Sequence, residues 1–233
     1  MAAYGLNEFL TEVEGDLAWR TEEVRALKRL LSRASDGPTE GALRRSLILF
    51  LYAHAEGGVK TTLTCYVRVI NALKLQMGEC VPPIVAAAFD DLFRALSDQA
   101  RKHPFFRSRL PDDPKIHRMA RHTDFVARIR EAEAHPVQLD HETIVDTESN
   151  LDPDVLMKIL FHLGFPPDVV SRRFDDLHYL RGLRNAIAHG ERRTVTEDQC
   201  AKYERTVFQA LLPKLRDLLA TAIRQESFRR NVA

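Results

Sequence analysis

The sequence has few of the features that mark a secreted, membrane-bound or metal-binding protein. Its 233 residues include only three cysteines, Cys65, Cys80 and Cys200, and none belongs to a CxxC pair or a Cys/His cluster. We therefore expect free buried thiols in a reducing compartment, with no disulfide framework, no metal and no cofactor. The N-terminus lacks a basic region followed by an apolar one, and no apolar run approaches the roughly 18 residues that span a bilayer. These absences predict a cytoplasmic protein that makes no membrane contact.

An excess of charge of one sign is also missing. The net charge is +1 at pH 7, so any attraction to a polyanion must come from a local patch. The composition, 45% hydrophobic and 29% charged, is that of a soluble globular protein with a sizeable core. The length suits one large domain, and we predict a single domain over residues 1–233.

Helical periodicity dominates the chain, and no strand pattern competes with it. The predicted helices span residues 7–33, 39–74, 83–102, 166–189 and 196–224. Asn7 is the expected N-cap of the first, Gly190 follows the end of the fourth, and Thr196 with Gln199 forms a capping box at the start of the last. The second helix is apolar nearly all round, as in the centre of a bundle. The fold class is therefore all-α, an antiparallel bundle of four to five long helices.

Residues 103–165 differ in character and are predicted to be a loop-rich insertion between core helices. The stretch 101–121 holds seven Lys or Arg against two acids, together with Phe105 and Phe106. These residues either contact phosphates and stack on bases, or form an excursion whose phenylalanines dock on the core. The stretch 131–157 holds eight acids and no Lys or Arg, and is predicted to be mostly loop. Asp152 and Pro153 then begin a short helix that ends near Gly164.

A candidate site lies in Leu180–Gly190, where an arginine, an asparagine and a histidine end an apolar helix. On a helical wheel the apolar stripe consists of Leu177, Leu180, Leu183 and Ile187. Arg184 falls inside this stripe, so it needs an acidic partner, and a purely structural pair would meet that need. His189 lies about 140° from Arg184. Either the last turn unwinds at Gly190, or a second protomer completes a site that uses both residues.

A second group of polar residues lies in the middle of the long second helix. Tyr52, Glu56 and Lys60 are four residues apart and so share one face. Glu56 either pairs with Lys60 on a solvated face or points inward to order Arg184. The adjacent Gly57 and Gly58 cost about 1 kcal/mol each relative to alanine, which indicates that a neighbouring segment passes close by.

These two motifs together resemble the HEPN superfamily. Residues 184–189, Arg-Asn-Ala-Ile-Ala-His, match its Arg-x(4–6)-His pattern in the Arg-Asn-x-x-x-His form. The stretch 52–60 resembles a branch of predicted HEPN toxins with the pattern Tyr-x-His-Trp-Glu-Gly-x-Val-Lys, and departs from it at Ala55. The resemblance covers residues 40–75 and 168–220. It implies a helical bundle that forms homodimers, with the motifs of two protomers meeting in a cleft.

The resemblance also implies a metal-independent endoribonuclease of a toxin–antitoxin or phage-defence system. Its RNA substrate would supply the 2′-hydroxyl as nucleophile, and two protomers would supply one histidine as base and one as acid. In this interpretation His189 is the general acid/base and Arg184 stabilises the charge of the transition state. Asn185 orients His189 or holds a phosphate oxygen, and Arg181 binds an adjacent phosphate.

Three residues of the second helix are expected to support this site. Glu56 and Tyr52 would order Arg184, whereas His54 either joins them or is a satisfied core histidine. Two other hypotheses remain open. One is a non-catalytic RNA- or nucleotide-binding HEPN module, which the basic stretch 101–121 fits. The other is an interaction domain for a cognate antitoxin that modifies a tyrosine near the motif, for which Tyr179 is a poor match.

Overall fold

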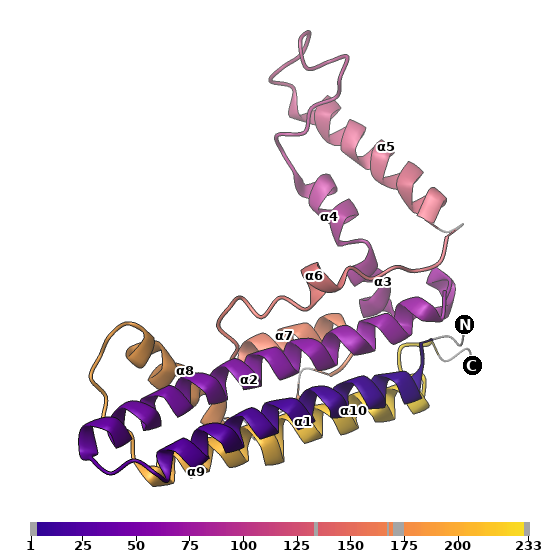
Figure 1. Cartoon of the computed structure of the whole chain (residues 1–233). Helices are drawn as coiled ribbons and strands as arrows, with labels where there is room; N and C mark the ends of the chain where they lie inside the picture. Colours follow the sequence, from indigo (N-terminus) through magenta and orange to yellow (C-terminus); the bar gives the residue numbers. More distant parts are fainter. Residues whose placement is uncertain (1–3, 133–134, 167, 170–174, 231–233) are drawn as a thin grey trace.

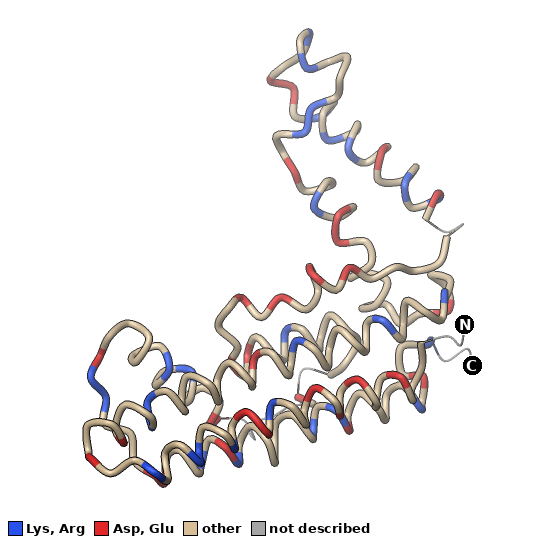
Figure 2. The backbone as a smooth tube through the Cα atoms, in the orientation of Figure 1, with Lys and Arg blue, Asp and Glu red and all other residues tan. Residues whose placement is uncertain are grey.

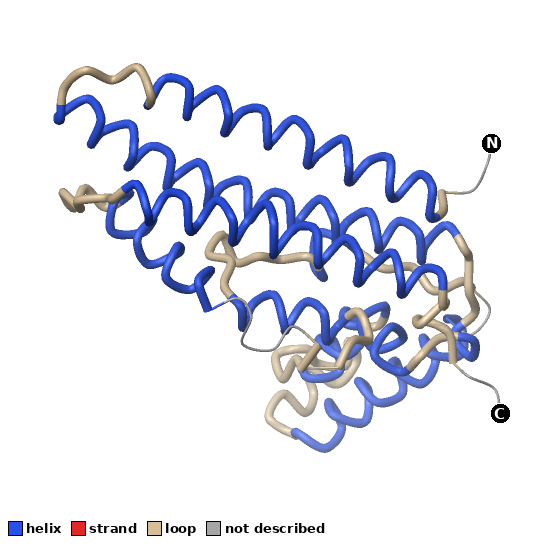
Figure 3. The backbone as a smooth tube through the Cα atoms, turned by 90° about the horizontal axis from the view of Figure 1, so that it is seen from below, coloured by secondary structure: helices blue, strands red, loops and turns tan. Residues whose placement is uncertain are grey.

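The computed structural model describes residues 4–132, 135–166, 168–169 and 175–230. Helices account for nearly all regular structure of these residues, and none of them belongs to a β-sheet. Figure 1 shows long helices lying side by side, and Figure 3 shows the same bundle after a 90° rotation. The predicted all-α class is confirmed.

Helices α1 (Leu6–Leu31) and α2 (Gly37–Ala72) form an antiparallel pair. The N-cap of α1 is Gly5, whose amide donates to Glu8 at 3.0 Å, so the prediction of Asn7 as N-cap is wrong. Asp36 caps α2 by accepting from the Thr39 amide at 2.7 Å. Helix α2 contacts α1 on one side and α8 (Asp175–Ala188) on the other, which explains why its middle is apolar nearly all round.

The predicted C-terminal helix is continuous but changes its geometry midway. It comprises α9 (Glu197–Arg205), a π-helical segment η2 (Thr206–Leu211) and α10 (Leu212–Arg224). Pro213 cannot donate to the carbonyl four residues before it, and its ring crowds that carbonyl, so the preceding turn widens. The predicted capping box is present, since Gln199 donates its amide to the Thr196 hydroxyl at 3.2 Å and accepts from the Thr196 amide at 3.0 Å.

The predicted third helix, 83–102, is not one helix. It is divided at Phe89 into α3 (Pro82–Ala88) and α4 (Asp90–Ser97), and it ends before residue 102. The basic stretch that follows is also more helical than predicted. Helix α5 (Pro114–Ala132) occupies a region expected to be loop, and it packs against α4. We call residues 90–132 the arm, because α4 and α5 project away from the bundle in Figure 1.

The second half of the predicted insertion is part of the core rather than an excursion. After α6 (His141–Ile144) and the loop 146–152 comes α7 (Pro153–His162), capped by Asp152 at the Val155 amide as the sequence predicts. The buried hydrophobic residues of this segment are Val137, Leu139, Ile144, Val145, Leu151, Leu156, Ile159, Leu160, Leu163 and Phe165. Only the arm leaves the bundle, so the predicted boundary at 103–165 does not describe the division that the structure shows.

Three further predictions concern the start of α8, the state of the cysteines and the absence of a membrane-spanning helix. The expected start of the motif helix at residues 166–168 lies partly outside the described residues, and Asp168 with Val169 forms a turn. Cys65, Cys80 and Cys200 are free and buried, as predicted. No helix of the described ranges combines the length and the apolar character that crossing a bilayer requires.

Candidate functional site

The motif residues lie on the last two turns of α8, which remain helical to the end. Gly190 has a φ of +86°, a conformation that glycine adopts without strain. Its amide donates to the Ile187 carbonyl at 3.0 Å, and the Glu191 amide donates to the Ala186 carbonyl at 2.9 Å. These two bonds form a Schellman motif that closes the helix. The last turn therefore does not unwind, and Arg184 and His189 keep their different directions.

Arg184 points toward α2 and is held by four neighbours. Its guanidinium carbon lies 4.0 Å from the ring centroid of Tyr52, and one of its nitrogens lies 3.7 Å from a carboxylate oxygen of Glu56. It also donates to the Asn185 side-chain oxygen at 2.7 Å and to the Ser149 carbonyl at 3.3 Å. An aromatic face and a carboxylate both favour a planar cation. The guanidinium is thus fixed in one orientation while its side chain stays 24% exposed.

Glu56 and Tyr52 are themselves anchored to the loop 146–152. Glu56 accepts from the Thr147 hydroxyl at 2.8 Å, and Tyr52 donates its hydroxyl to the Leu151 carbonyl at 3.2 Å. Burial, together with the nearby Glu56 carboxylate, raises the pKa of Tyr52 to about 12. The phenol is therefore neutral at physiological pH. The expected approach of Glu56 to Arg184 is present, and no ion pair joins Glu56 to Lys60.

Arg181 is paired with an acid rather than open to solvent. It donates to Asp152, whose other oxygen caps α7 at the Val155 amide. A second contact runs to Nδ1 of His178 at 3.3 Å. Both members of the Arg181–Asp152 pair are mostly buried. The arginine expected to bind an adjacent phosphate therefore fixes the loop 146–152 to α8.

Asn185 and His189 differ in how far the chain engages them. The Asn185 side chain accepts from Arg184, and its amide nitrogen lies 3.3 Å from the Asn150 side-chain oxygen. His189 is exposed, and its imidazole makes no hydrogen bond or ion pair with any described residue. The Asn185 side chain thus orients Arg184 in this structure and makes no hydrogen bond with the His189 imidazole, although the His189 amide donates to the Asn185 carbonyl at 2.9 Å within the helix. The chain brings Arg184, Asn185 and Glu56 together and leaves the histidine facing outward.

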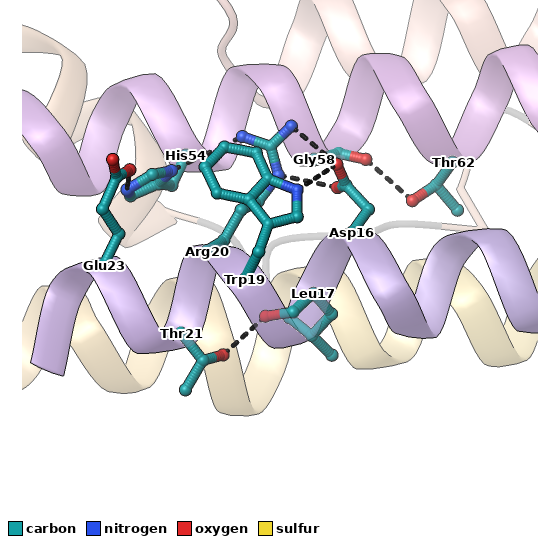
Figure 4. A network of polar contacts seen from close by, with 9 residues as sticks. All are labelled: Asp16, Leu17, Trp19, Arg20, Thr21, Glu23, His54, Gly58 and Thr62. Atoms are coloured by element: carbon teal, nitrogen blue, oxygen red, sulfur yellow. Dashed lines mark hydrogen bonds and ion pairs between the residues drawn. The ribbon is translucent and has the colours of Figure 1, made fainter.

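His54 lies on the other side of α2 and is not part of this group. Its imidazole is buried against α1, where Nδ1 lies 3.4 Å from Arg20 and Nε2 lies 3.2 Å from Glu23 (Figure 4). The expectation that it supports Arg184 is wrong for a geometric reason. His54 is two residues from both Tyr52 and Glu56, which places it about 200° from each on the helix. The alternative, a core histidine, describes its position, but its buried Nε2 makes no hydrogen bond with a described residue and only lies within ion-pair distance of Glu23.

The two glycines of α2 are explained by close neighbours. A Cβ on Gly57 would lie 2.7 Å from the Arg20 guanidinium, and one on Gly58 would lie 2.8 Å from the Leu212 side chain. Arg20 is buried and held by Asp16 at 2.6 Å, so it has little room to move. The sequence-based inference that other segments pass close to this point is correct. Gly58 lets α10 approach α2 directly opposite the site.

Sequence reasoning missed the contribution of the loop 146–152. Thr147, Ser149, Asn150 and Asp152 all contact the motif residues or their partners. The sequence pattern predicts only a helix cap for Asp152. In the structure one carboxylate oxygen accepts from the Val155 amide and caps α7, and the other accepts from Arg181. Within the described ranges, no group of three or more His, Cys, Asp or Glu side chains is placed to hold a metal ion.

The all-α bundle, with Arg184 and His189 at the end of α8 and α8 packed against α2, is the arrangement expected of a HEPN-type domain. The family model described as MAE_28990-like HEPN matches residues 9–228, and the chain belongs to this family. The HEPN superfamily includes ribonucleases and nucleotide-binding modules. No curated protein and no solved structure matches the chain.

Proposed function

We propose that this protein is a metal-independent endoribonuclease that cleaves RNA through the substrate's 2′-hydroxyl at a site shared by two copies of the chain. The observation that carries the proposal is the arrangement of Arg184. Its guanidinium is oriented in advance by Tyr52 and Glu56 yet remains partly exposed. Such a preorganised cation is suited to stabilise charge that develops on a phosphorane, because it needs no reorganisation at the moment of reaction.

The acids beside the motif support a mechanism without a metal. Glu56 faces Arg184 and Asp152 faces Arg181, so each carboxylate is engaged by a guanidinium. In the proposed reaction the 2′-oxygen attacks the adjacent phosphorus and the bond to the 5′-oxygen breaks. One His189 takes the proton of the 2′-hydroxyl, and the His189 of a second protomer gives a proton to the leaving oxygen. The products are a 2′,3′-cyclic phosphate and a free 5′-hydroxyl.

The homodimer belongs to the same proposal. Arg184 faces α2 whereas His189 faces solvent, and a two-fold contact through α8 would place two exposed histidines near one cleft. The protein would act in the cytoplasm as a toxin of a toxin–antitoxin pair or as a phage-defence effector, with a cognate antitoxin as a further partner.

The test is RNA cleavage by purified protein in excess EDTA, comparing wild type with His189→Ala and Arg184→Ala. We expect cyclic-phosphate products from the wild type and a loss of at least about 10²-fold in each variant. Cleavage that survives His189→Ala, or that EDTA abolishes, would overturn the proposal.

One observation favours a second candidate, a non-catalytic RNA- or nucleotide-binding module. Both motif arginines already have a carboxylate partner, so their charge is largely neutralised within the chain. In that case RNA would bind in a salt-sensitive manner, His189→Ala would leave binding unchanged, and no cleavage would be seen.

A further inference from the structure

The arm has little structural role in the bundle from which it projects. Helix α5 packs against α4, and of its nineteen residues only His117 is buried. His117 holds the tip together, since Nδ1 accepts from the His103 amide at 3.2 Å and Nε2 lies 2.9 Å from the Leu110 carbonyl. The remaining surface of α5 is open to a partner (Figure 1).

Positive charge is concentrated on this arm. Residues 101–130 contain nine Lys or Arg and three Asp, whereas the rest of the chain keeps 25 Lys or Arg and 30 Asp or Glu. The whole arm, residues 90–132, holds ten Lys or Arg and seven Asp or Glu, so its positive charge is concentrated in the outer part, residues 101–130. Figure 2 shows blue segments along α5 and the arm's tip, and red segments along the loop that leads back to the bundle.

The arm includes five exposed cations that have no acidic partner among the residues that the structure describes. Arg107, Arg109, Lys115, Arg118 and Arg128 are exposed and make no ion pair with any described residue. Exposed cations without carboxylate partners are available to phosphates.

Two other arginines of the arm have a structural role, which sets them apart from these five. Arg101 pairs with Asp124 at 2.8 Å, and Arg121 donates to the carbonyls of Leu96 and Arg101 at 3.1 and 3.2 Å. These contacts tie α5 to the segment that precedes it. Arg101, Arg121 and Asp124 also line the concave surface between α5 and the segment that precedes it.

That concave surface offers an aromatic and apolar lining beside the cations. The cavity holds about 590 Å³, and its lining includes Phe106, Ile116, Met119 and Ala120 together with Arg101 and Arg121. Phe105, next in sequence to Phe106 of the lining, is 52% exposed and carries the Arg109 guanidinium 4.4 Å from its ring centroid. Phe106 meets Phe105 edge-on at 5.0 Å. An exposed ring next to a guanidinium forms a stacking platform for a base.

We propose that the arm is an RNA-binding element that holds a single-stranded segment of the substrate, with its phosphates on the free cations and a base on Phe105. Single-stranded RNA fits better than a duplex, because a paired base cannot stack on a protein ring. A second copy of the chain fits less well, because five unpaired cations favour a polyanion. This inference rests on the proposed function, in that the RNA held by the arm is the RNA cleaved at α8.

The first experiment measures binding of a labelled, unstructured RNA of about 15 nucleotides. All proteins carry His189→Ala, so that the probe stays intact. The arm variant combines Arg107→Gln, Arg109→Gln and Arg118→Gln. The matched control combines Arg33→Gln, Lys214→Gln and Arg224→Gln, three exposed bundle cations without a described ion pair.

For the arm variant we expect at least tenfold weaker binding and a salt-dependence slope smaller by about 2, since each phosphate contact on a single strand contributes about 0.7. The control should bind like its parent. Equal loss in both triple variants, or no loss in the arm variant, would overturn the inference.

A second pair of variants tests the stacking platform separately from the charge. Phe105→Leu keeps an apolar side chain but removes the ring, and we expect about tenfold weaker binding. Phe105→Tyr keeps the ring and should bind like the parent. Equal binding by the Leu and Tyr variants would overturn the role of Phe105.

The outcomes also separate this inference from the proposed function. RNA binding that depends on the arm, in a wild-type protein that never cuts RNA, would support the arm and reject the ribonuclease. Normal cleavage and normal binding by the arm variant would support the ribonuclease and reject the role of the arm in RNA binding. An arm variant that loses self-association but binds RNA normally would assign the arm to a second copy and overturn the inference.

Discussion

The guanidinium of Arg184 lies over the ring of Tyr52, 4.0 Å from its centroid, with the Glu56 carboxylate 3.7 Å away. Tyr52 and Glu56 are one turn apart on α2, so the two contacts come from one face of one rigid helix. The loop 146–152 fixes that face from the other side, through Thr147 and Leu151. A cation held in this way is oriented before any substrate arrives. The free energy needed to order its side chain comes from folding and is not taken from substrate binding.

Glu56→Gln tests whether this orientation matters for catalysis. The amide can keep the bond to Thr147 but loses the ion pair with Arg184. We expect kcat for RNA cleavage to fall about tenfold, equivalent to about 1.4 kcal/mol. KM should stay the same or fall, because one carboxylate near the RNA phosphates has been removed. Steady-state kinetics on a short RNA measures both.

The matched control is Glu22→Gln, which removes a carboxylate from exposed ion pairs with Arg25 and Arg29 on α1. It should cleave like the wild type. A rise in KM with unchanged kcat in Glu56→Gln would mean that Glu56 acts on binding, and Arg184 would not need it for the chemical step.

Gly182→Leu tests the proposed dimer contact. Gly182 is exposed in the interior of α8 and lies within about 20° of His189 around the helix. Among the residues that the structure describes, no atom of another segment lies within 4 Å of a Cβ built at this position. The variant should therefore fold at least as stably as the wild type, since leucine favours helix over glycine by about 0.8 kcal/mol. If α8 meets a second α8, the added side chain will weaken the dimer and abolish cleavage.

Sedimentation velocity and the EDTA cleavage assay together measure this outcome. Gly15→Leu is the control, because Gly15 lies inside α1, is exposed, and also has nothing within 4 Å. A Gly182→Leu protein that dimerises and cleaves RNA like the wild type would place the dimer contact elsewhere.

Local patterns predicted the direction of the site residues but not all of their partners. The wheel placed Arg184 toward the core and Glu56 on the face of Tyr52, and these three side chains are in contact. The same helical geometry excludes His54 from the face that contacts Arg184, because His54 lies about 200° from Tyr52 around the helix. The Arg181–Asp152 pair joins residues 29 apart, one at the start of α7 and one on α8, and no periodicity encodes such a pairing.

The arm shows the same distinction between local and distant signals. The sequence analysis predicts a loop-rich segment where α5 lies. Yet Asp113 and Pro114 begin this helix in the same way that Asp152 and Pro153 begin α7. Asp113 accepts from the Lys115 amide at 2.9 Å. The division of α3 from α4 at Phe89 could not be predicted, since neither glycine nor proline marks it. It depends on where the arm leaves the bundle, which is a tertiary property.

Gly58→Ala tests the close approach of α2 and α10. The new Cβ would lie 2.8 Å from the Leu212 side chain, which is buried in the core. We expect overpacking to outweigh the gain of about 1 kcal/mol in helix propensity, with a net loss of about 1–2 kcal/mol in the free energy of unfolding. Gly15→Ala, with open space around it, should instead gain about 1 kcal/mol. In a Leu212→Ala background, which lacks the crowding side chain, Gly58→Ala should no longer lower the free energy of unfolding, and an unchanged loss there would show that the steric contact is not its cause.

His54 should make the stability of the bundle sensitive to acid. Burial lowers the pKa of His54, and Arg20 lowers it further, whereas Glu23 and Asp16 act in the opposite direction. The folded chain therefore prefers the neutral imidazole, and the unfolded chain takes up the proton more readily. This contribution to the free energy of unfolding is fully present above the unfolded pKa of about 6.5 and is lost as the pH falls below it.

Urea unfolding at about pH 7.5 and pH 5.5 should show a larger loss of unfolding free energy on acidification for wild type than for His54→Gln. His122→Gln, at an exposed position on the arm, should keep the wild-type difference. Equal losses in wild type and His54→Gln would show that Glu23 compensates the burial of His54 in full.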